Sequence, residues 1–83
     1  MNPLYEGRLL GLRAERGESV RAEFNLRMQS YRDMSKWKRT AMGYFAKAVF
    51  DGLVRGDRIG ERDDLFRRWY QYLEGNPHFQ EAR

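Results

Sequence analysis

The stretch from Ser19 to Met28 constrains this chain most, because it alternates strictly between apolar and polar residues. The apolar positions are Val20, Ala22, Phe24, Leu26 and Met28, and the polar ones are Arg21, Glu23, Asn25 and Arg27. Apolar residues at every second position are typical of a β-strand with one buried face. A helix would spread this apolar set around most of its circumference. The alternation therefore predicts an amphipathic strand whose outer face is polar and mostly basic.

A second alternating segment precedes this strand, at residues 8–14, with Leu10, Leu12 and Ala14 on one side. A loop at residues 16–18 would pair the two segments so that every apolar residue meets an apolar partner, which would fix the register. The two segments together therefore predict an N-terminal β-hairpin.

Residues 3–15 also allow a helix, which would begin at Pro3 and carry Tyr5, Leu9 and Leu12 on one face. Glycine opposes this alternative, because each of the two glycines in the segment costs about 1 kcal/mol relative to alanine inside a helix. The hairpin is the favoured interpretation, and the helix remains open.

The apolar period becomes helical from about Ser30. Apolar residues at three- and four-residue steps are Met34, Trp37, Ala41, Tyr44 and Ala48, and Phe45, Val49 and Leu53. Ser30 or Ser35 offers an N-cap, and Gly43 can divide the segment into two helices. A last helix is expected from about Glu61 to Glu74. Its predicted core stripe is Leu65, Phe66, Trp69, Tyr72 and Leu73.

The expected fold class is α+β: an N-terminal β-hairpin or single ribbon strand, followed by two to three α-helices. Eighty-three residues suit one small domain, which we place at residues 1–75, with a tail at residues 76–83. The chain has no cysteine and no apolar run long enough for a membrane span. A cytoplasmic location is the expectation, and the small basic character is compatible with a phage or mobile-element protein.

Catalysis is not expected from this sequence. The single histidine, His78, falls in the predicted tail, and neither a P-loop nor a G-x-S-x-G motif occurs. Asp63 and Asp64 suit the positive N-terminal end of the last helix, and no third ligand stands at metal-binding spacing. The sequence therefore predicts a non-enzymatic protein without cofactor or metal.

Positive charge is concentrated in the middle of the chain. Residues 19–60 hold nine Lys and Arg against four Asp and Glu, whereas the whole chain has a net charge of +4. Such a concentration is expected of a nucleic-acid interface. The predicted contact residues are Arg21, Glu23, Asn25 and Arg27 on the strand, and Lys36, Lys38, Arg39 and Lys47 on the helix that follows. Arginine and asparagine are well suited to reading base edges, and the helical cations to binding phosphate.

Residues 23–28, Glu-Phe-Asn-Leu-Arg-Met, resemble the DNA-reading strand of the ribbon-helix-helix repressors of the Arc and Mnt type. The resemblance implies that two chains pair their strands into a ribbon that enters the major groove of DNA. By position, it implies Glu23, Asn25 and Arg27 as the base-reading residues. It also implies that Phe24, Leu26 and Met28 mostly face the core of a homodimer. Pairing across such a dimer competes with the hairpin within one chain.

Three functional hypotheses follow. A small DNA-binding regulator explains where the positive charge lies. A small protein-binding inhibitor or adaptor, which occupies a host protein complex through its hairpin and exposed aromatics, better explains the 14% aromatic content. An assembly subunit of a phage particle is the third. The charge distribution favours the first over the second by a narrow margin.

Overall fold

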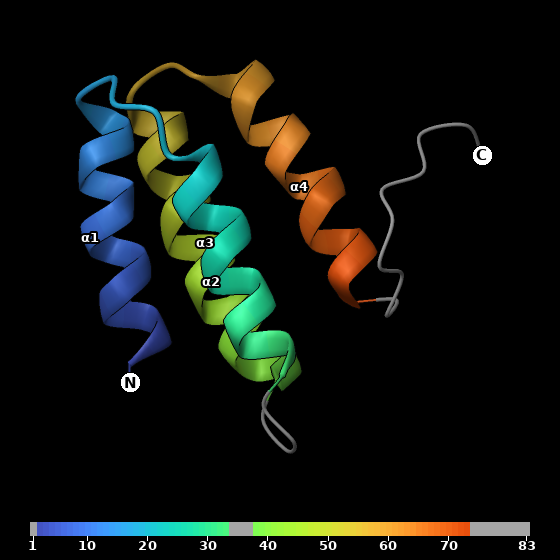
Figure 1. The fold of residues 1–83 in the computed structure, drawn as a ribbon. Helices are drawn as coiled ribbons and strands as arrows, with labels where there is room; N and C mark the ends of the chain where they lie inside the picture. Colours follow the sequence, from blue (N-terminus) through green and yellow to red (C-terminus); the bar gives the residue numbers. More distant parts are fainter. Residues whose placement is uncertain (1, 34–37, 74–83) are drawn as a thin grey trace.

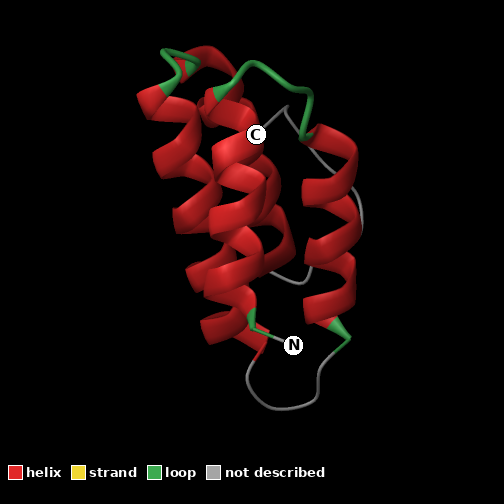
Figure 2. Cartoon of the chain, turned by 90° about the vertical axis from the view of Figure 1, so that its left-hand side faces the viewer, coloured by secondary structure: helices red, strands yellow, loops and turns green. Residues whose placement is uncertain are grey.

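Four α-helices form the fold in a computed structural model, which describes residues 2–33 and 38–73 (Figure 1). The helices are α1 (Pro3–Glu15), α2 (Arg21–Arg32), α3 (Lys38–Arg55) and α4 (Ile59–Leu73). All regular structure in the described segments is helical, as Figure 2 shows. The predicted α+β class is therefore wrong, because both alternating segments of the expected hairpin belong to helices.

The third helix is the centre of the arrangement. It packs against α1, α2 and α4, whereas the backbone of α1 approaches α3 alone and α2 also packs against α4. Figure 1 shows α1 and α4 on opposite sides of the α2–α3 pair. Successive helices run in opposite directions, so that α1 is parallel to α3 and α2 is parallel to α4. The bundle is thus flat, and α1 joins it through α3 alone.

The alternating segment forms α2 because a spacing of four residues satisfies both a strand and a helix. Val20, Phe24 and Met28 stand four residues apart and are fully buried together with Tyr31. The other apolar positions of the alternation turn away from this core, and Leu26 is 67% exposed. Most residues between them are good helix formers without glycine or proline. A single buried stripe at helical spacing therefore outweighs the period of two.

The helix over residues 3–15, our alternative interpretation, is confirmed by α1. Its start is well defined, because Asn2 accepts a hydrogen bond from the backbone N–H of Tyr5 at 3.2 Å and Pro3 is the first helical residue. Its end is a Schellman turn around Gly17, whose φ is 94°.

Gly7 and Gly11, which opposed a helix in isolation, are the surface through which α1 packs on α3. A Cβ atom on Gly7 would lie 2.6 Å from the carbonyl oxygen of Phe45, and one on Gly11 2.6 Å from that of Ala48. The two backbones are therefore too close for any side chain at these positions. Tertiary packing offsets the low helix propensity of glycine, which propensity alone could not indicate.

The two later helices differ in detail from the prediction. Ser30 lies inside α2 and is not an N-cap, and Gly43 does not divide α3. Met34, Ser35 and Trp37 lie outside the described residues. The last helix begins at Ile59, two residues before the expected Glu61.

The predicted core stripe of the last helix is confirmed in part. Leu65 is buried, and Trp69, Tyr72 and Leu73 pack against the core while partly buried. Phe66 was expected in the core and is instead 46% exposed. The predicted tail at residues 76–83 lies outside the described residues. Within the described part of the chain, no helix has the length and apolar character to cross a membrane.

Candidate protein-binding groove between α1 and α2

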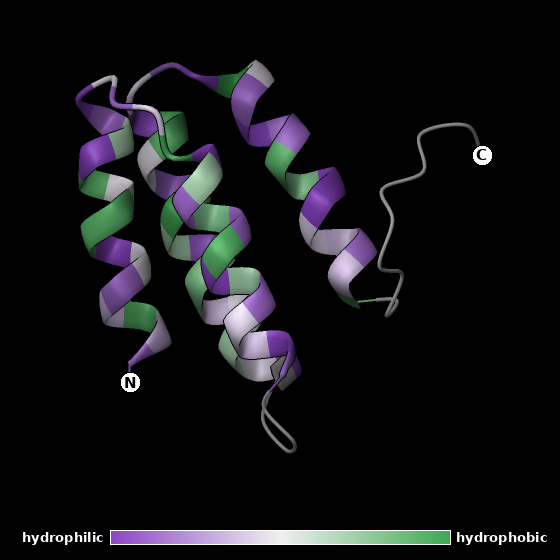
Figure 3. Ribbon diagram, in the orientation of Figure 1, coloured by the Kyte–Doolittle hydropathy of each residue, from purple (hydrophilic) through white to green (hydrophobic). Residues whose placement is uncertain are grey.

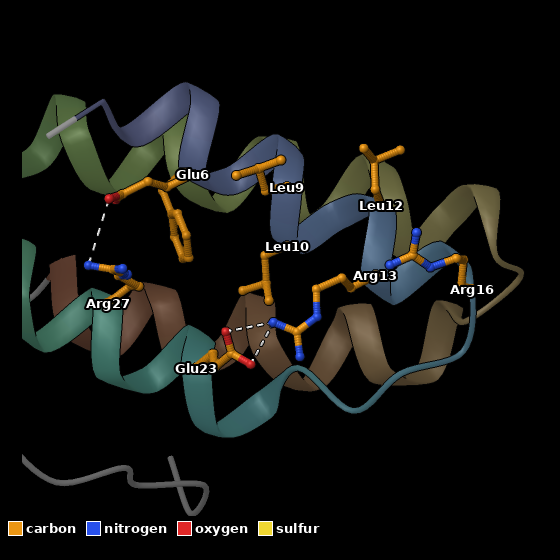
Figure 4. Close-up of a pocket in the computed structure, with 9 residues that line it drawn as sticks. Glu6, Leu9, Leu10, Leu12, Arg13, Arg16, Glu23 and Arg27 are labelled. Carbon is orange, nitrogen blue, oxygen red and sulfur yellow. Dashed lines mark hydrogen bonds and ion pairs between the residues drawn. The ribbon is translucent and has the colours of Figure 1, made fainter.

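A groove separates α1 from α2 on one side of the bundle (Figure 4). The backbones of these two helices do not approach each other, and the space between them is about 400 Å³. Its lining comes from both helices and from one residue of α3: Glu6, Leu9, Leu10, Leu12, Arg13, Arg16, Glu23, Arg27 and Phe45. The groove is therefore a consequence of the close α1–α3 contact, which draws α1 toward α3 and away from α2.

The inner part of the groove is apolar and continues onto the outer face of α1. Leu10 and Phe45 belong to the buried core, whereas Leu9 is 46% and Leu12 50% exposed. Tyr5 is also exposed and lies one helical turn before Leu9. Figure 3 shows hydrophobic positions, in green, along the whole length of α1. Together, Tyr5, Leu9 and Leu12 form an apolar stripe that no described residue covers, here called the α1 stripe.

Arginine and glutamate side chains bridge the groove in two places. Arg13 of α1 binds Glu23 of α2 at 2.8 Å, and Arg27 of α2 lies 3.7 Å from Glu6 of α1 (Figure 4). Arg13 and Arg16 both bind Glu18, at 2.9 and 3.1 Å. Hydrogen bonds from these two guanidinium groups, that of Arg13 first, hold the pKa of Glu18 below its ordinary value. The rim therefore alternates in sign and carries one more arginine than the two glutamates that line it.

Glu6 also connects the groove to the core. The hydroxyl of Tyr31, which is fully buried, donates a hydrogen bond to the Glu6 carboxylate. Burial raises the pKa of the Tyr31 phenol above its ordinary value, and the hydrogen bond to Glu6 raises it further. Glu6 is thereby held between Tyr31 and Arg27, so this end of the groove has a fixed polar wall.

The predicted DNA-reading residues do not share one outer face. Glu23 and Arg27 bind α1 residues across the groove, while Arg21 binds Asp64 of α4 at 3.2 Å. Asn25 is half-buried, and its Oδ1 atom is buried without a hydrogen-bond partner among the described residues. The ribbon interpretation is therefore wrong, because the residues that suggested it lie on different sides of a helix.

The three residues expected to form the core of a homodimer, Phe24, Leu26 and Met28, do not share one exposed face. Phe24 and Met28 are fully buried inside one chain, so they cannot face a partner without unfolding α2. Leu26, the third residue of that set, is the only one of the three that is exposed. Residues 23–28, which carried the resemblance to ribbon-helix-helix repressors, lie within α2 and form no strand.

The helical cations are partly engaged within the chain. Arg39 donates to the carbonyl oxygen of Leu73 at 3.1 Å, where a positive charge suits the C-terminal end of α4. Lys47 binds Asp51 one turn later at 3.1 Å. Lys36 and the side chain of Lys38 lie outside the described residues. Arg39 thus contributes to the packing of α4 onto the bundle as well as to the positive charge.

Two of the charged groove residues were predicted from the sequence as DNA contacts, and two others were not predicted at all. Glu23 and Arg27 were predicted as base readers, whereas Arg13 and Arg16 were not singled out. The signal for the α1 stripe was present, because Tyr5, Leu9 and Leu12 share one face of the alternative helix. That this face points outward depends on Gly7 and Gly11 occupying the buried side.

Comparisons with known proteins give no information on the groove. No protein-family model matches the chain, and neither a curated protein nor a solved structure matches it significantly. Within the described residues, no group of three or more His, Cys, Asp or Glu side chains is placed to hold a metal ion.

Proposed function

We propose that this chain is a protein-binding adaptor or inhibitor whose α1–α2 groove receives one amphipathic helix of a partner protein. The observation that carries the proposal is the α1 stripe beside the groove, where Leu9 and Leu12 are about half exposed above a floor of Leu10 and Phe45. An apolar groove between two helices is a common receptor for the apolar face of a third helix. The proposal keeps the cytoplasmic location expected from the sequence.

A helix fits this surface better than a small molecule does. The groove alone, at about 400 Å³, has the size of a small-ligand site. The apolar surface does not end at the groove, however, since the exposed Tyr5, one turn before Leu9, extends it over the outer face of α1. An occupant that covers the groove and the stripe together must be longer than a drug-sized ligand. A helix with apolar residues at three- and four-residue steps meets that requirement.

The charged rim gives such a helix its orientation. The ion pairs of Arg13 and Arg27 across the groove are partly solvent-exposed, so each stabilises the free protein only weakly. Exchange of these partners for carboxylates on the incoming helix therefore costs little. Arg8, on the exposed side of α1, has no ion pair among the described residues and adds a further positive group. An acidic flank on the partner helix would complement these arginines.

A photo-crosslinking residue in place of Leu9 or Leu12 tests this proposal in cells that naturally contain the protein. We expect both positions to give one and the same adduct mass, and the matched exposed position Lys47 on α3 to give none. Introduction of Leu12→Glu should abolish the Leu9 adduct, whereas Leu26→Glu should not, since Leu26 is also exposed but does not line the groove. Absence of a discrete adduct at both groove positions would contradict the proposal.

Nucleic-acid binding is a second candidate, supported by the charge around the α2–α3 connection. Residues 32–39 contain Arg32, Lys36, Lys38 and Arg39 against one aspartate. Anisotropy of a labelled random-sequence duplex at about 50 and 200 mM salt tests it, with at least a tenfold loss of affinity expected at the higher concentration. Lys38→Ala should weaken binding, and Lys47→Ala, at a cation already paired with Asp51, should weaken it less. No binding at either salt concentration excludes this candidate.

A further inference from the structure

The outer face of α4 carries a second apolar stripe, separate from the groove. Ile59, Phe66 and Tyr70 are 41%, 46% and 52% exposed. They stand seven and four residues apart, a spacing that places them on one side of the helix. Ile59, Phe66 and Tyr70 are here called the α4 stripe. Figure 3 shows α4 as mostly hydrophilic, in purple, with a few hydrophobic positions in green.

Aromatic packing holds the middle of the α4 stripe in place. The ring of Phe66 lies 5.9 Å from that of Phe50 on α3 and 5.4 Å from that of Trp69. Val54, one turn after Phe50 on α3, is exposed as well. A ring that is buttressed on one side and exposed on the other loses little conformational freedom when a partner covers it.

One acidic and one basic residue flank the α4 stripe at equal distances in sequence from Leu65. Asp63 lies two residues before Leu65 and Arg67 two residues after it. Ile59 and Tyr70 lie six residues before and five residues after the same point. The side chains of Asp63 and Arg67 are 60% and 58% exposed, and their intrachain partners are Arg62 and Asp64. When a second α4 runs in the opposite direction, Asp63 of each copy is therefore level with Arg67 of the other.

From this order we infer that α4 is the contact surface for a second copy of the chain, packed antiparallel about a two-fold axis that crosses the outer face of α4 at the level of the buried Leu65. In that register Asp63 of each copy faces Arg67 of the other, and Ile59 packs on the ring of Tyr70. The two Phe66 rings meet close to the axis. A two-fold contact uses the same patch on both copies, so the face must be complementary to itself. The order of Asp63 and Arg67 meets that condition, because the reversed pairing makes two ion pairs and no like-charge contact between them.

Charge exchange tests this arrangement by sedimentation equilibrium of the full chain over a wide concentration range. Asp63→Arg places two arginines opposite each other, and Arg67→Asp places two aspartates opposite each other. We expect each single change to weaken the dimer about tenfold or more, since like charges at a contact are costly. The double variant Asp63→Arg/Arg67→Asp restores both ion pairs in reverse and should return the dissociation constant to near that of the original chain.

The double variant separates an interface from an effect inside one chain. The intrachain hydrogen bond between Arg67 and Asp64 is lost in Arg67→Asp and in the double variant alike, so that bond cannot account for a recovered dissociation constant. Phe66→Glu should abolish the dimer while far-UV circular dichroism still shows a helical fold, and Leu26→Glu should leave the dimer unchanged. A chain that stays monomeric at every concentration, or a double variant no better than the singles, overturns the inference.

Discussion

Gly52 of α3 lies directly against Gly11 of α1, so that a Cβ atom on Gly52 would overlap the backbone carbonyl of Gly11. Gly7 and Ala48 continue the same contact one turn earlier. Two parallel helices with small residues four apart can approach until their backbones touch. This contact sets the position of α1, and through it the width of the groove beside α2.

Gly52→Ala should therefore destabilise the protein by about 2–4 kcal/mol, since the added methyl group meets backbone rather than a movable side chain. Urea unfolding followed by circular dichroism measures the change. Gly43→Ala is the matched control in the same helix, because nothing lies within 4 Å of a Cβ atom there. It should stabilise the protein by about 0.5–1 kcal/mol. Equal effects of the two substitutions would mean that α1 and α3 are not in close contact.

The helices could be predicted only where the spacing of the apolar residues fits a helix and not a strand. The α3 and α4 segments have helical spacing alone, and both were expected within a few residues of their observed ends, apart from the start of α3. The segment with Val20, Phe24 and Met28 fits two periods, since four residues equal two strand repeats and about one helical turn. Which period applies depends on the surface that covers the segment. That surface comes from α3 and α4, far along the chain.

The candidate site could not be predicted from local sequence patterns, because it depends on distances between helices. Glu23 and Arg27 stood out as polar residues, but their partners Arg13 and Glu6 lie ten and twenty-one residues earlier. The exposure of Leu9 and Leu12 follows from glycines packing on the opposite side of α1. No local pattern indicates such a contact, because glycine by its low helix propensity argues against a helix.

Arg58 joins the two connections at the end of the bundle. One of its nitrogens donates to the carbonyl oxygens of Ala14 and Glu18, at 2.6 and 2.8 Å, and another binds Glu61 at 2.6 Å. Arg58→Ala should cost about 2–3 kcal/mol, because it removes charged hydrogen bonds from half-buried carbonyl groups. Lysine at this position should recover only part of the loss, since it lacks the forked geometry. Arg62→Ala, which removes a pair with the adjacent Asp63, should cost much less in the same unfolding measurement.

Asp57 holds a left-handed backbone conformation, with a φ of 58°, at the end of α3. The N–H groups of Asp57 and Arg58 return to the carbonyl oxygens of Val54 and Leu53, so the position is fixed by a Schellman turn. Asp57→Gly should stabilise the protein by about 0.5–1 kcal/mol, because glycine adopts this conformation without strain. Asp51→Gly, inside α3, should instead destabilise it, because glycine has the lower helix propensity and the ion pair with Lys47 is lost. A loss of melting temperature in Asp57→Gly would contradict this account.

The stability of the folded protein should fall in acid, because two carboxylates have a lowered pKa in the folded state. Hydrogen bonds from Arg67, and then from Arg21, hold the pKa of Asp64 below its ordinary value of 3.8, and those from Arg13 and Arg16 do the same for Glu18. A carboxylate with a lowered pKa in the folded state stabilises the protein fully above its ordinary pKa. That stabilisation is lost as the pH falls through the folded-state value.

We therefore expect the free energy of unfolding to decline from about pH 5 to pH 3, with the folded state binding protons less readily than the unfolded state. Because these pairs lie at the surface, about 1 M salt should flatten the decline by screening them. Asp64→Asn should also reduce the slope, since one of the two carboxylates no longer titrates. Urea titrations at half-unit steps of pH measure both effects, and a slope that neither salt nor Asp64→Asn changes would assign the acid sensitivity to other groups.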